Sequence, residues 1–420
     1  MTKDFIKTLI AEYQNLIPTI ELVDRNYQFE ANLNYVLVGL RRAGKSYLLY
    51  QQMQRLIREG HNIKEFLYFN FEDDRINSLL LEDLDLIKTC YEEMYDCRPI
   101  FFLDEIQLID KWEKFARRLA DQKYRVYVTG SNAKMLSSEI ATTLGGRYMV
   151  KEVFPFSFGE FLRFSKIDIR QPNVLYIENK AIQKVFDAYF RQGGLPEVLQ
   201  VQDKRAWLSS LFNRIVFGDL ITRHQIRNDF ALKILVRKLA ESVKQPSSYT
   251  RLANVVSSVG KKISVDTVID YVKYMEESWL ILPFENISAK LNEKESNRKY
   301  YLTDNGIMNL FLTDPNTSLL ENIVAINLRR YYGKEVYFYN SQIEVDFYVP
   351  DESLAVQVCY SLQDVETRDR EFEALLKMSN RLNVNYLMAI TKDEESEVEY
   401  HDKTIRIVPV WKWLLSLENQ

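Results

Sequence analysis

Cysteine, histidine and long apolar segments are scarce in this chain. Its 420 residues include three cysteines and three histidines. Cys90 and Cys97 lack the spacing of zinc ligands, and Cys359 stands far from both, so the sequence predicts neither a disulfide framework nor a structural zinc site. No apolar run approaches the roughly 18 residues that a membrane-spanning helix needs. The N-terminal segment contains acidic residues and no apolar block with a cleavage site, so we expect no signal peptide and a cytoplasmic protein.

The charge balance excludes one class of function. The chain has 55 Lys and Arg residues against 59 Asp and Glu residues, a net charge of −4. A nearly neutral, slightly acidic protein is not a general coat for nucleic acid, so any basic surface must be local. Hydrophobic residues make up 46% of the chain, and a chain of this length predicts two or three domains rather than one core.

Short apolar strands alternate with amphipathic helices in the first third of the chain. Such alternation predicts an α/β fold with a parallel sheet and helices on both faces. A first helix is expected at 5–17, where apolar residues recur at helical spacing. Strands are expected at 35–38, 66–71, 100–103 and 125–128, and helices at 45–60, 81–94 and 112–119.

Two further regions follow. After Phe154 the pattern is mainly helical, and residues 231–310 have the pattern of a winged helix, with two helices joined at Gly260 and two wing strands after them. From about residue 318, helix and strand patterns return as a second α/β unit. The predicted domains are 1–165, 166–310 and 311–420.

A phosphate-binding motif lies between the first expected strand and the next helix. Residues 39–46, Gly-Leu-Arg-Arg-Ala-Gly-Lys-Ser, match G-x-x-x-x-G-K-[ST] in the strand-then-helix context that supports it. The glycines let successive backbone N–H groups face a polyphosphate, and the helix N-terminus adds its positive end. Lys45 is expected to reach the β- and γ-phosphates, and the Ser46 hydroxyl to bind Mg²⁺. The residues expected to contact ATP are Gly39, Arg41, Arg42, Ala43, Gly44, Lys45, Ser46 and Tyr47.

A second motif supports the first. The strand expected at 100–103 ends in Asp104 and Glu105. We expect Asp104 to lie beside Ser46 and hold Mg²⁺ directly or through water. Glu105 is placed to polarise the attacking water. The alternative is a strand that simply ends in solvated acids.

Other polar residues near the motif carry less information. Ser131 or Asn132 follows the strand at 125–128 and is a candidate contact for the γ-phosphate or the water, if that strand lies between the other two; an ordinary turn is the alternative. Arg147 is a candidate for neutralising phosphate charge, in its own subunit or toward a neighbouring subunit of a homo-oligomer. A structural salt bridge is the alternative for Arg147.

Together these motifs resemble the AAA+ superfamily, and more closely a bacterial and archaeal group of predicted AAA-type ATPases with a C-terminal domain of unknown function. The strongest strings are GLRRAGKSYLLY at 39–50, FFLDEIQLIDKWE at 101–113, VTGSNAKMLSSE at 128–139 and LGGRYMVKEVFPFSFGEFL at 144–162. Weaker ones are Gly-Gly-Leu-Pro-Glu at 193–197, Leu-Glu-Asn at 320–322 and Glu-Val-Asp-Phe at 344–347.

The resemblance implies an ATPase core, a helical lid with a winged helix, and a C-terminal domain similar to PD-(D/E)XK nucleases. It assigns Lys45 and Ser46 to nucleotide phosphate and magnesium. Asp104 and Glu105 are assigned to magnesium and water activation, and Asn132 to a sensor role. The resemblance does not define what the ATP is used for.

Nuclease chemistry of that kind needs a carboxylate cluster for Mg²⁺ and a lysine near the attacking water. Glu344 and Asp346 alternate along one strand and so face the same side, and Glu321 lies on the preceding helix. Gln357, on the next strand, is a weak metal ligand, and Cys359 stands where the lysine is expected. The basic residues that remain as substitutes are Arg368, Arg370 and Lys377. The sequence favours a non-catalytic fold for binding or docking over an active nuclease.

DNA is a candidate partner through the winged helix. Residues 231–310 contain 12 Lys or Arg against 9 Asp or Glu, a local charge of +3. Lys261 and Lys262 precede the helix that would enter the major groove. Several acids on or beside that helix oppose DNA binding, so contact with a protein partner is the alternative.

Three functions stay open. The leading hypothesis is an ATP-driven switch acting on a DNA or protein partner, in which ATP orders the lid and hydrolysis releases it. The second is an ATP-gated DNA nuclease, which needs the C-terminal carboxylates to bind metal despite Cys359. The third is a nucleotide-bound interaction protein without hydrolysis, against which Glu105 argues. The absence of an Asn-Lys-x-Asp string, together with the resemblance, favours ATP over GTP.

Overall fold

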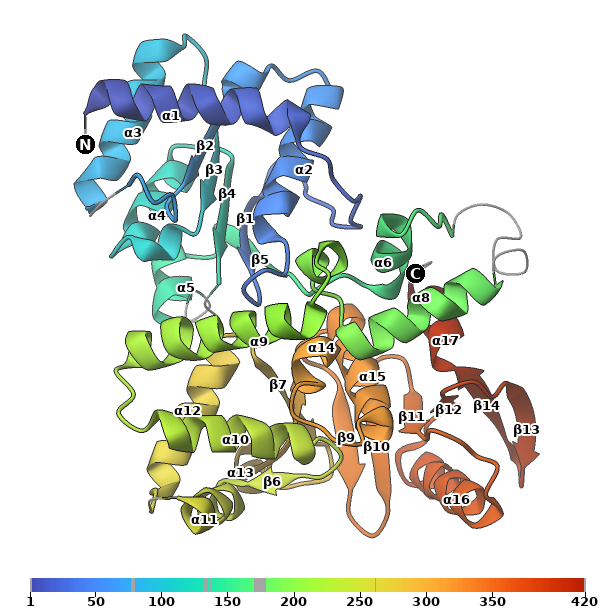
Figure 1. The fold of residues 1–420 in the computed structure, drawn as a ribbon. Coiled ribbons are helices and arrows are strands. Elements are labelled where there is room, and N and C mark those ends of the chain that lie inside the picture. The colour runs from blue at the N-terminus through green and yellow to red at the C-terminus, as the bar shows by residue number, and fades with distance from the viewer. Residues whose placement is uncertain are drawn as a thin grey trace. The chain divides into compact units, whose positions relative to one another are not determined.

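The computed structural model describes residues 2–76, 80–131, 135, 138–169, 179–260 and 262–418. The chain divides into two compact units, Met1–Phe154 and Pro155–Gln420 (Figure 1). Each unit contains a β-sheet flanked by helices. The α/β class expected from the sequence is therefore confirmed.

The first unit is built on a five-stranded parallel sheet. Consecutive residues of its inner strands are buried, and because successive side chains point to opposite faces, both faces of the sheet are covered. The edge strand at 148–152 differs, since Met149 and Val150 are each nearly half exposed. In spatial order the strands are β2 (Phe66–Asn70), β3 (Ile100–Asp104), β4 (Val126–Gly130), β1 (Asn34–Val38) and β5 (Tyr148–Glu152).

Amphipathic helices pack against this sheet. In the helix at 112–121, Trp112, Phe115 and Leu119 recur three and four residues apart, and all three are buried. The helices are α1 (Lys3–Leu16), α2 (Lys45–Arg58), α3 (Leu81–Met94), α4 (Trp112–Asp121) and α5 (Ser138–Leu144), with 3-10 turns η1 (Ile17–Thr19), η2 (Ile63–Glu65) and η3 (Ile106–Leu108). The strands and helices expected before residue 130 are confirmed within a few residues at their ends, and β4 does lie between β1 and β3.

The second unit is mainly helical at its start. An eight-residue π-helical stretch, η6 (Ile215–Thr222), continues directly from the preceding helix. The helices are α6 (Phe158–Phe164), α8 (Asn179–Gln192), η5 (Pro196–Gln200), α9 (Lys204–Arg214), α10 (Asp229–Glu241), α11 (Tyr249–Val259), α12 (Val265–Glu277), α13 (Leu291–Ser296), α14 (Asn305–Met308), α15 (Asn316–Tyr332), α16 (Val365–Leu382) and α17 (Val410–Leu417).

One mixed sheet of nine strands runs through this second unit. Its spatial order is β13 (Ser396–Tyr400), β14 (Lys403–Pro409), β12 (Tyr386–Thr391), β11 (Leu354–Val358), β10 (Glu344–Val349), β9 (Tyr337–Asn340), β7 (Ile281–Asn286), β8 (Asn297–Leu302) and β6 (Ser247–Ser248). β7 pairs in parallel with β9, so the hairpin β7–β8 continues the C-terminal sheet. The division into 166–310 and 311–420 therefore crosses one sheet, and the three predicted domains stay a prediction.

The Gly-Gly segment noted in the sequence has a structural explanation. Gly193 has φ +77°, and a Cβ there would lie 2.2 Å from Oδ1 of Asp304. The Asp304 carboxylate accepts hydrogen bonds from the N–H groups of Gly194 (2.8 Å) and Ile307 (3.1 Å). Only glycine fits a left-handed position pressed this closely on a buried carboxylate.

None of the helices in the part of the chain that the structure describes combines the length and apolar character that crossing a bilayer requires.

Candidate functional site

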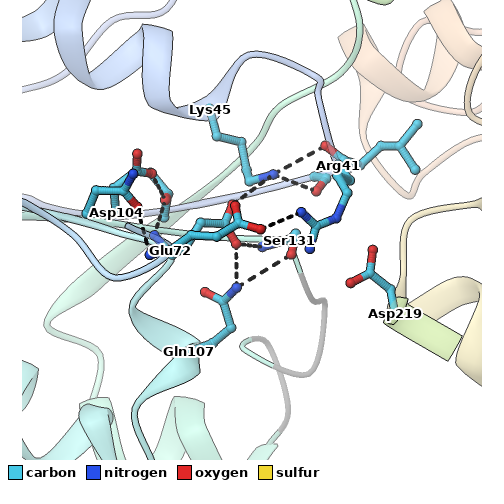
Figure 2. A network of polar contacts seen from close by, with 12 residues as sticks. Arg41, Lys45, Glu72, Asp104, Gln107, Ser131 and Asp219 are labelled. Atoms are coloured by element: carbon cyan, nitrogen blue, oxygen red, sulfur yellow. Dashed lines mark hydrogen bonds and ion pairs between the residues drawn. The ribbon is translucent and has the colours of Figure 1, made fainter. Parts of the chain in front are cut away.

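The two sequence motifs meet at the carboxyl edge of the five-stranded sheet. β1 leads into the loop at 39–44, β3 ends at Asp104, and β4 ends at Gly130. The parallel register brings these strand ends to the same edge, with Val38 opposite Gly130. Figure 2 shows the side chains of Lys45, Asp104 and Gln107 gathered there.

The loop between β1 and α2 depends on its glycines. A Cβ at Gly39 would lie 2.1 Å from the carbonyl oxygen of Val153, so no larger residue fits there. Gly44 has φ +95° and directly precedes α2, a left-handed position that favours glycine. The first N–H groups of a helix have no partner within it, which leaves those of α2 available to a ligand at the loop.

Lys45 is folded back onto this loop. Its side chain is 4% exposed, and its Nζ donates to the carbonyl oxygens of Gly39 (3.2 Å) and Leu40 (3.3 Å). The same Nζ lies 3.5 Å from Oε1 of Glu105. The cation expected to bind phosphate is therefore paired with the acid expected to activate water.

Asp104 is buried and held by three hydroxyl groups. Thr129 donates to its Oδ1, and the Tyr68 hydroxyl donates to its Oδ2 at 2.7 Å. The Ser46 side chain is hydrogen-bonded to the same carboxyl group. Burial, and then the charge of Glu105, raise the pKa of Asp104, while the three hydrogen bonds act in the opposite direction.

Glu105 lies beside Asp104 in a left-handed backbone conformation with φ +54°. Its Oε2 accepts hydrogen bonds from the side-chain amide of Gln107 and from the backbone N–H of Ser131 at 3.3 Å. Burial alone would raise the pKa of Glu105, but the positive charge of Lys45 and these hydrogen bonds outweigh it, so the pKa is lowered. Glu105 is therefore held as a carboxylate.

The three arginines predicted to act at the site lie in different parts of the first unit. Arg41 forms an ion pair with Glu72 at 2.7 Å near the phosphate loop, and Arg42 occupies a left-handed position in the same loop. Arg147 precedes β5 at the opposite edge of the sheet, where it pairs with Asp121. This ion pair is the structural salt bridge that the sequence left open as the alternative for Arg147, and its role toward phosphate stays a prediction.

Tyr47 and Asn132 were also predicted to belong to the site. Tyr47 is 55% exposed on the first turn of α2 and packs edge to face on Tyr50. Asn132, expected to act as a sensor, lies outside the described residues.

Sequence reasoning missed Arg25. Its guanidinium is 4% exposed and donates to the carbonyl oxygens of Ala43 and Phe154, both at 2.9 Å. Arg25 thus ties the phosphate loop to Phe154, the second residue after β5. It lies before the first motif in a segment without periodicity, so no local pattern marked it.

Tyr68, Thr129 and Gln107 were also missed as parts of the site. Tyr68 reads as one more apolar position of a buried strand, and its hydroxyl becomes informative only when β2 lies beside β3. Thr129 and Gln107 lie two or three residues from residues that the motifs did identify. Their closeness to Ser131 and Glu105 was the available signal.

The C-terminal carboxylates form a second cluster, but a lysine lies among them. The Nζ of Lys299, on β8, lies 3.3 Å from Glu321, 3.1 Å from Glu344 and 3.2 Å from Asp346. The Lys299 side chain is fully buried, and the negative charges raise its pKa despite burial. Gln357 uses its amide oxygen to accept the N–H of Asp346 at 3.0 Å.

This cluster borders a cleft of about 640 Å³ in the second unit. The cleft is lined by acids and by basic residues such as Lys244 and Arg370. In the described part of the chain, no group of three or more His, Cys, Asp or Glu side chains is arranged to hold a metal ion. The ammonium group of Lys299 lies 3.1–3.3 Å from an oxygen of each of the three carboxylates.

Comparisons with known proteins agree with this geometry. Residues 31–162 match the family model of the AAA domain, and residues 183–318 match a domain of unknown function (DUF8612). An uncharacterised protein of Methanocaldococcus jannaschii is 30% identical over 99% of this chain and 96% of its own length. An uncharacterised protein of Haemophilus influenzae is 29% identical over 90% of this chain and 94% of its own.

Solved structures are more distant. The Walker-type ATPase of Pyrococcus abyssi aligns with 73% of this chain and 94% of its own at 13% identity, with a TM-score of 0.42. The Orc1 protein of Aeropyrum pernix, solved in complex with DNA, covers 74% of this chain and 92% of its own at 12% identity, with a TM-score of 0.28. TM-scores this low support no argument about function.

The sheet order, the loop between β1 and α2, and the acids after β3 define the first unit as a P-loop ATPase fold of the AAA type. This agrees with the resemblance of the motifs. The chain belongs to the same family as the uncharacterised Methanocaldococcus jannaschii protein, which it matches over nearly its whole length.

Proposed function

We propose that this protein binds ATP together with Mg²⁺ and hydrolyses the ATP. The observation that carries the proposal is the hydrogen-bonded pair of Ser46 and Asp104 beside the phosphate loop. A hydroxyl at a helix N-terminus and a carboxylate at a neighbouring strand end are the protein groups that bind magnesium in P-loop ATPases. The AAA-domain match over residues 31–162 supports the same chemistry.

The residues present fit both ligands. Gly39, which approaches Val153 closely, and the left-handed Gly44 place main chain without a side chain at both ends of the loop. Ser46 and Asp104 would hold the Mg²⁺, which neutralises charge on the phosphates. The buried Lys45 would add a second positive charge at the β- and γ-phosphates.

The pairing of Lys45 with Glu105 suggests how binding prepares hydrolysis. A polyphosphate carries more negative charge than one carboxylate, so Lys45 would exchange Glu105 for phosphate oxygens when ATP binds. Glu105 would then be free to orient and accept a proton from the attacking water, still positioned by Gln107 and Ser131.

Single substitutions test this proposal directly. Glu105→Gln should bind ATP with nearly wild-type affinity and lose about 100-fold or more in turnover, because general-base catalysis is removed. Lys45→Ala should lose affinity and turnover together. Glu113→Gln, the same change on the neighbouring helix α4, is the matched control. Wild-type protein that binds ATP but releases no phosphate would refute hydrolysis and favour a nucleotide-bound interaction protein.

We propose further that nucleotide state switches the action of the protein on a DNA or protein partner. The order α10, β6, α11, α12 and hairpin β7–β8 is that of a winged helix, which supports DNA contact. Asp266 and Asp270 on α12 oppose it by repelling phosphates. Lys262 is described by the structure, whereas Lys261 is not. ATP turnover with and without duplex DNA separates the two partner classes, because only a DNA partner changes the rate.

For the C-terminal unit we propose a binding or docking role rather than nuclease activity. The position of Lys299 among Glu321, Glu344 and Asp346 supports this, since the ammonium group competes with metal for the same oxygens. Wild-type protein and Asp346→Ala should both leave plasmid DNA intact with Mg²⁺ or Mn²⁺. Cleavage by the wild type that Asp346→Ala abolishes would reverse this proposal.

A further inference from the structure

The hydroxyl groups of two tyrosines form a chain of hydrogen bonds that ends at Asp104. Tyr68, on β2, donates to Oδ2 of Asp104 at 2.7 Å, and its oxygen lies 3.0 Å from the hydroxyl of Tyr50, on α2. An ionised carboxylate only accepts hydrogen bonds and a phenol has one proton, so Tyr50 donates to Tyr68 and Tyr68 donates to Asp104. These hydrogen bonds connect the helix that begins at Lys45 to the acid at the end of β3.

The ring of Tyr68 has little freedom to move. It is 1% exposed, and it packs edge to face on Tyr13 with a centroid distance of 4.9 Å and an interplanar angle of 75°. The ring of Tyr50 lies against it with a centroid distance of 5.3 Å. Close packing of this kind fixes the position of the hydroxyl group.

The other oxygen of Asp104 is held as well. Thr129 donates to Oδ1, and it accepts the backbone N–H of Glu105 at 2.9 Å. One donor on each oxygen restrains the rotation of the carboxylate, while Ser46 makes a third hydrogen bond to it. Together these hydrogen bonds orient Asp104 toward Ser46.

We propose that Tyr68 is a positioning residue of the magnesium site, which holds Asp104 against Ser46, and that Tyr50 supports it from α2. This inference rests on the proposed Mg²⁺-dependent binding of ATP. Residues that hydrogen-bond to metal ligands typically change metal affinity by about 10–100-fold when they are mutated. Removal of the Tyr68 hydroxyl should therefore weaken the response to Mg²⁺ and leave the contacts of the phosphate loop unchanged.

The test compares the wild type with Tyr68→Phe and Tyr50→Phe, which keep the rings. The affinity for a fluorescent ATP analogue is measured across Mg²⁺ concentrations and in EDTA, beside ATP turnover and the melting temperature. Tyr68→Phe should need about tenfold more Mg²⁺ for the half-maximal effect, with unchanged affinity in EDTA. Tyr50→Phe should show a smaller shift in the same direction. Tyr148→Phe, which removes a 2.7 Å hydrogen bond to Ala116 elsewhere in the unit, should match the wild type.

The outcomes separate this inference from the proposed function. A Tyr68→Phe variant with the wild-type Mg²⁺ requirement overturns the inference and leaves ATP binding intact. A variant weakened equally in Mg²⁺ and in EDTA indicates a structural role and also overturns it. A wild type that binds no nucleotide, or binds it without response to Mg²⁺, overturns both. If Tyr68→Phe does not fold, an unshifted Mg²⁺ requirement in Tyr50→Phe overturns the inference.

Discussion

Replacing Lys299 by methionine tests whether the C-terminal carboxylates are balanced by an internal cation. Methionine keeps the unbranched apolar stem and removes the charge. The side chain of Glu321 is 4% exposed and that of Asp346 is 13% exposed, so both would lose a buried counter-charge. Removing one partner of a buried ion pair costs about 3–5 kcal/mol. Glu344 is 43% exposed and adds little to this cost.

The free energy of unfolding of Lys299→Met should fall by about 3–5 kcal/mol relative to the wild type. In a unit of this size that corresponds to a melting temperature lower by about 10 °C, which differential scanning calorimetry would measure. Burial, and then the charge of Asp346, raise the pKa of Glu321 even with Lys299 nearby, and loss of Lys299 raises it further.

The pH dependence of this loss has a definite sign. A carboxyl group whose pKa is raised by folding contributes stability that is fully present below its unfolded-state pKa and is lost as pH rises through its folded-state pKa. The deficit of Lys299→Met should therefore be larger at pH 8 than at pH 5. Lys377→Met is the matched control, because Lys377 pairs with Glu373 on the surface with its side chain 50% exposed, and the expected change is within about 0.5 kcal/mol. A deficit below about 1 kcal/mol, or one that does not change with pH, would refute the counter-ion argument.

Three further substitutions test individual residues. Arg25→Lys should weaken ATP binding by about tenfold, because an ammonium group cannot reproduce the two parallel guanidinium bonds that hold the phosphate loop; titration with a fluorescent nucleotide checks this, and unchanged affinity would contradict it. Asp304→Asn should lower the free energy of unfolding by about 2–3 kcal/mol, because the new amide would place a donor against the N–H of either Gly194 or Ile307; an unmoved denaturation midpoint would rule this out. Burial raises the pKa of Glu276 to about 7, so wild-type stability should fall as pH rises through 7. Glu276→Gln should then be more stable than the wild type by about 2 kcal/mol at pH 8 and nearly equal at pH 5, as followed by thermal unfolding.

The grouping of residues at the proposed phosphate site was predictable because they lie in two short strings. Gly39 to Ser46 span one loop and the start of one helix, and Asp104 and Glu105 follow one strand. Parallel strands bring their carboxyl ends to one edge, so recognising each string as the end of a strand was enough to place them together. Burial, register and hydrogen bonding then added Tyr68, which no quoted string contains, and Thr129, which stands in the string at 128–139 without a predicted role.

Two of the edge strands were harder to predict for a physical reason. β5 has neither a buried apolar run nor a clean alternation, and β13 alternates polar and apolar residues over only a few positions. Each lies at an edge of its sheet, and none of its residues is fully buried. Their strand structure comes from hydrogen bonding to a neighbour rather than from their own side chains. The pairing of β7 with β9 could likewise not be predicted from the sequence, because the two strands lie about 50 residues apart in it.

The positive charge of the C-terminal cluster could not be predicted from sequence proximity. The basic residues that follow Asp346 most closely in the sequence include Arg370 and Lys377. In the structure Arg370 pairs with Glu371 and Lys377 pairs with Glu373. The cation comes instead from Lys299, upstream of all the carboxylates, because hairpin β7–β8 joins the C-terminal sheet. A residue of the predicted winged helix thus supplies a counter-charge to the predicted nuclease-like site, so a domain boundary drawn between the two separates charges that need each other.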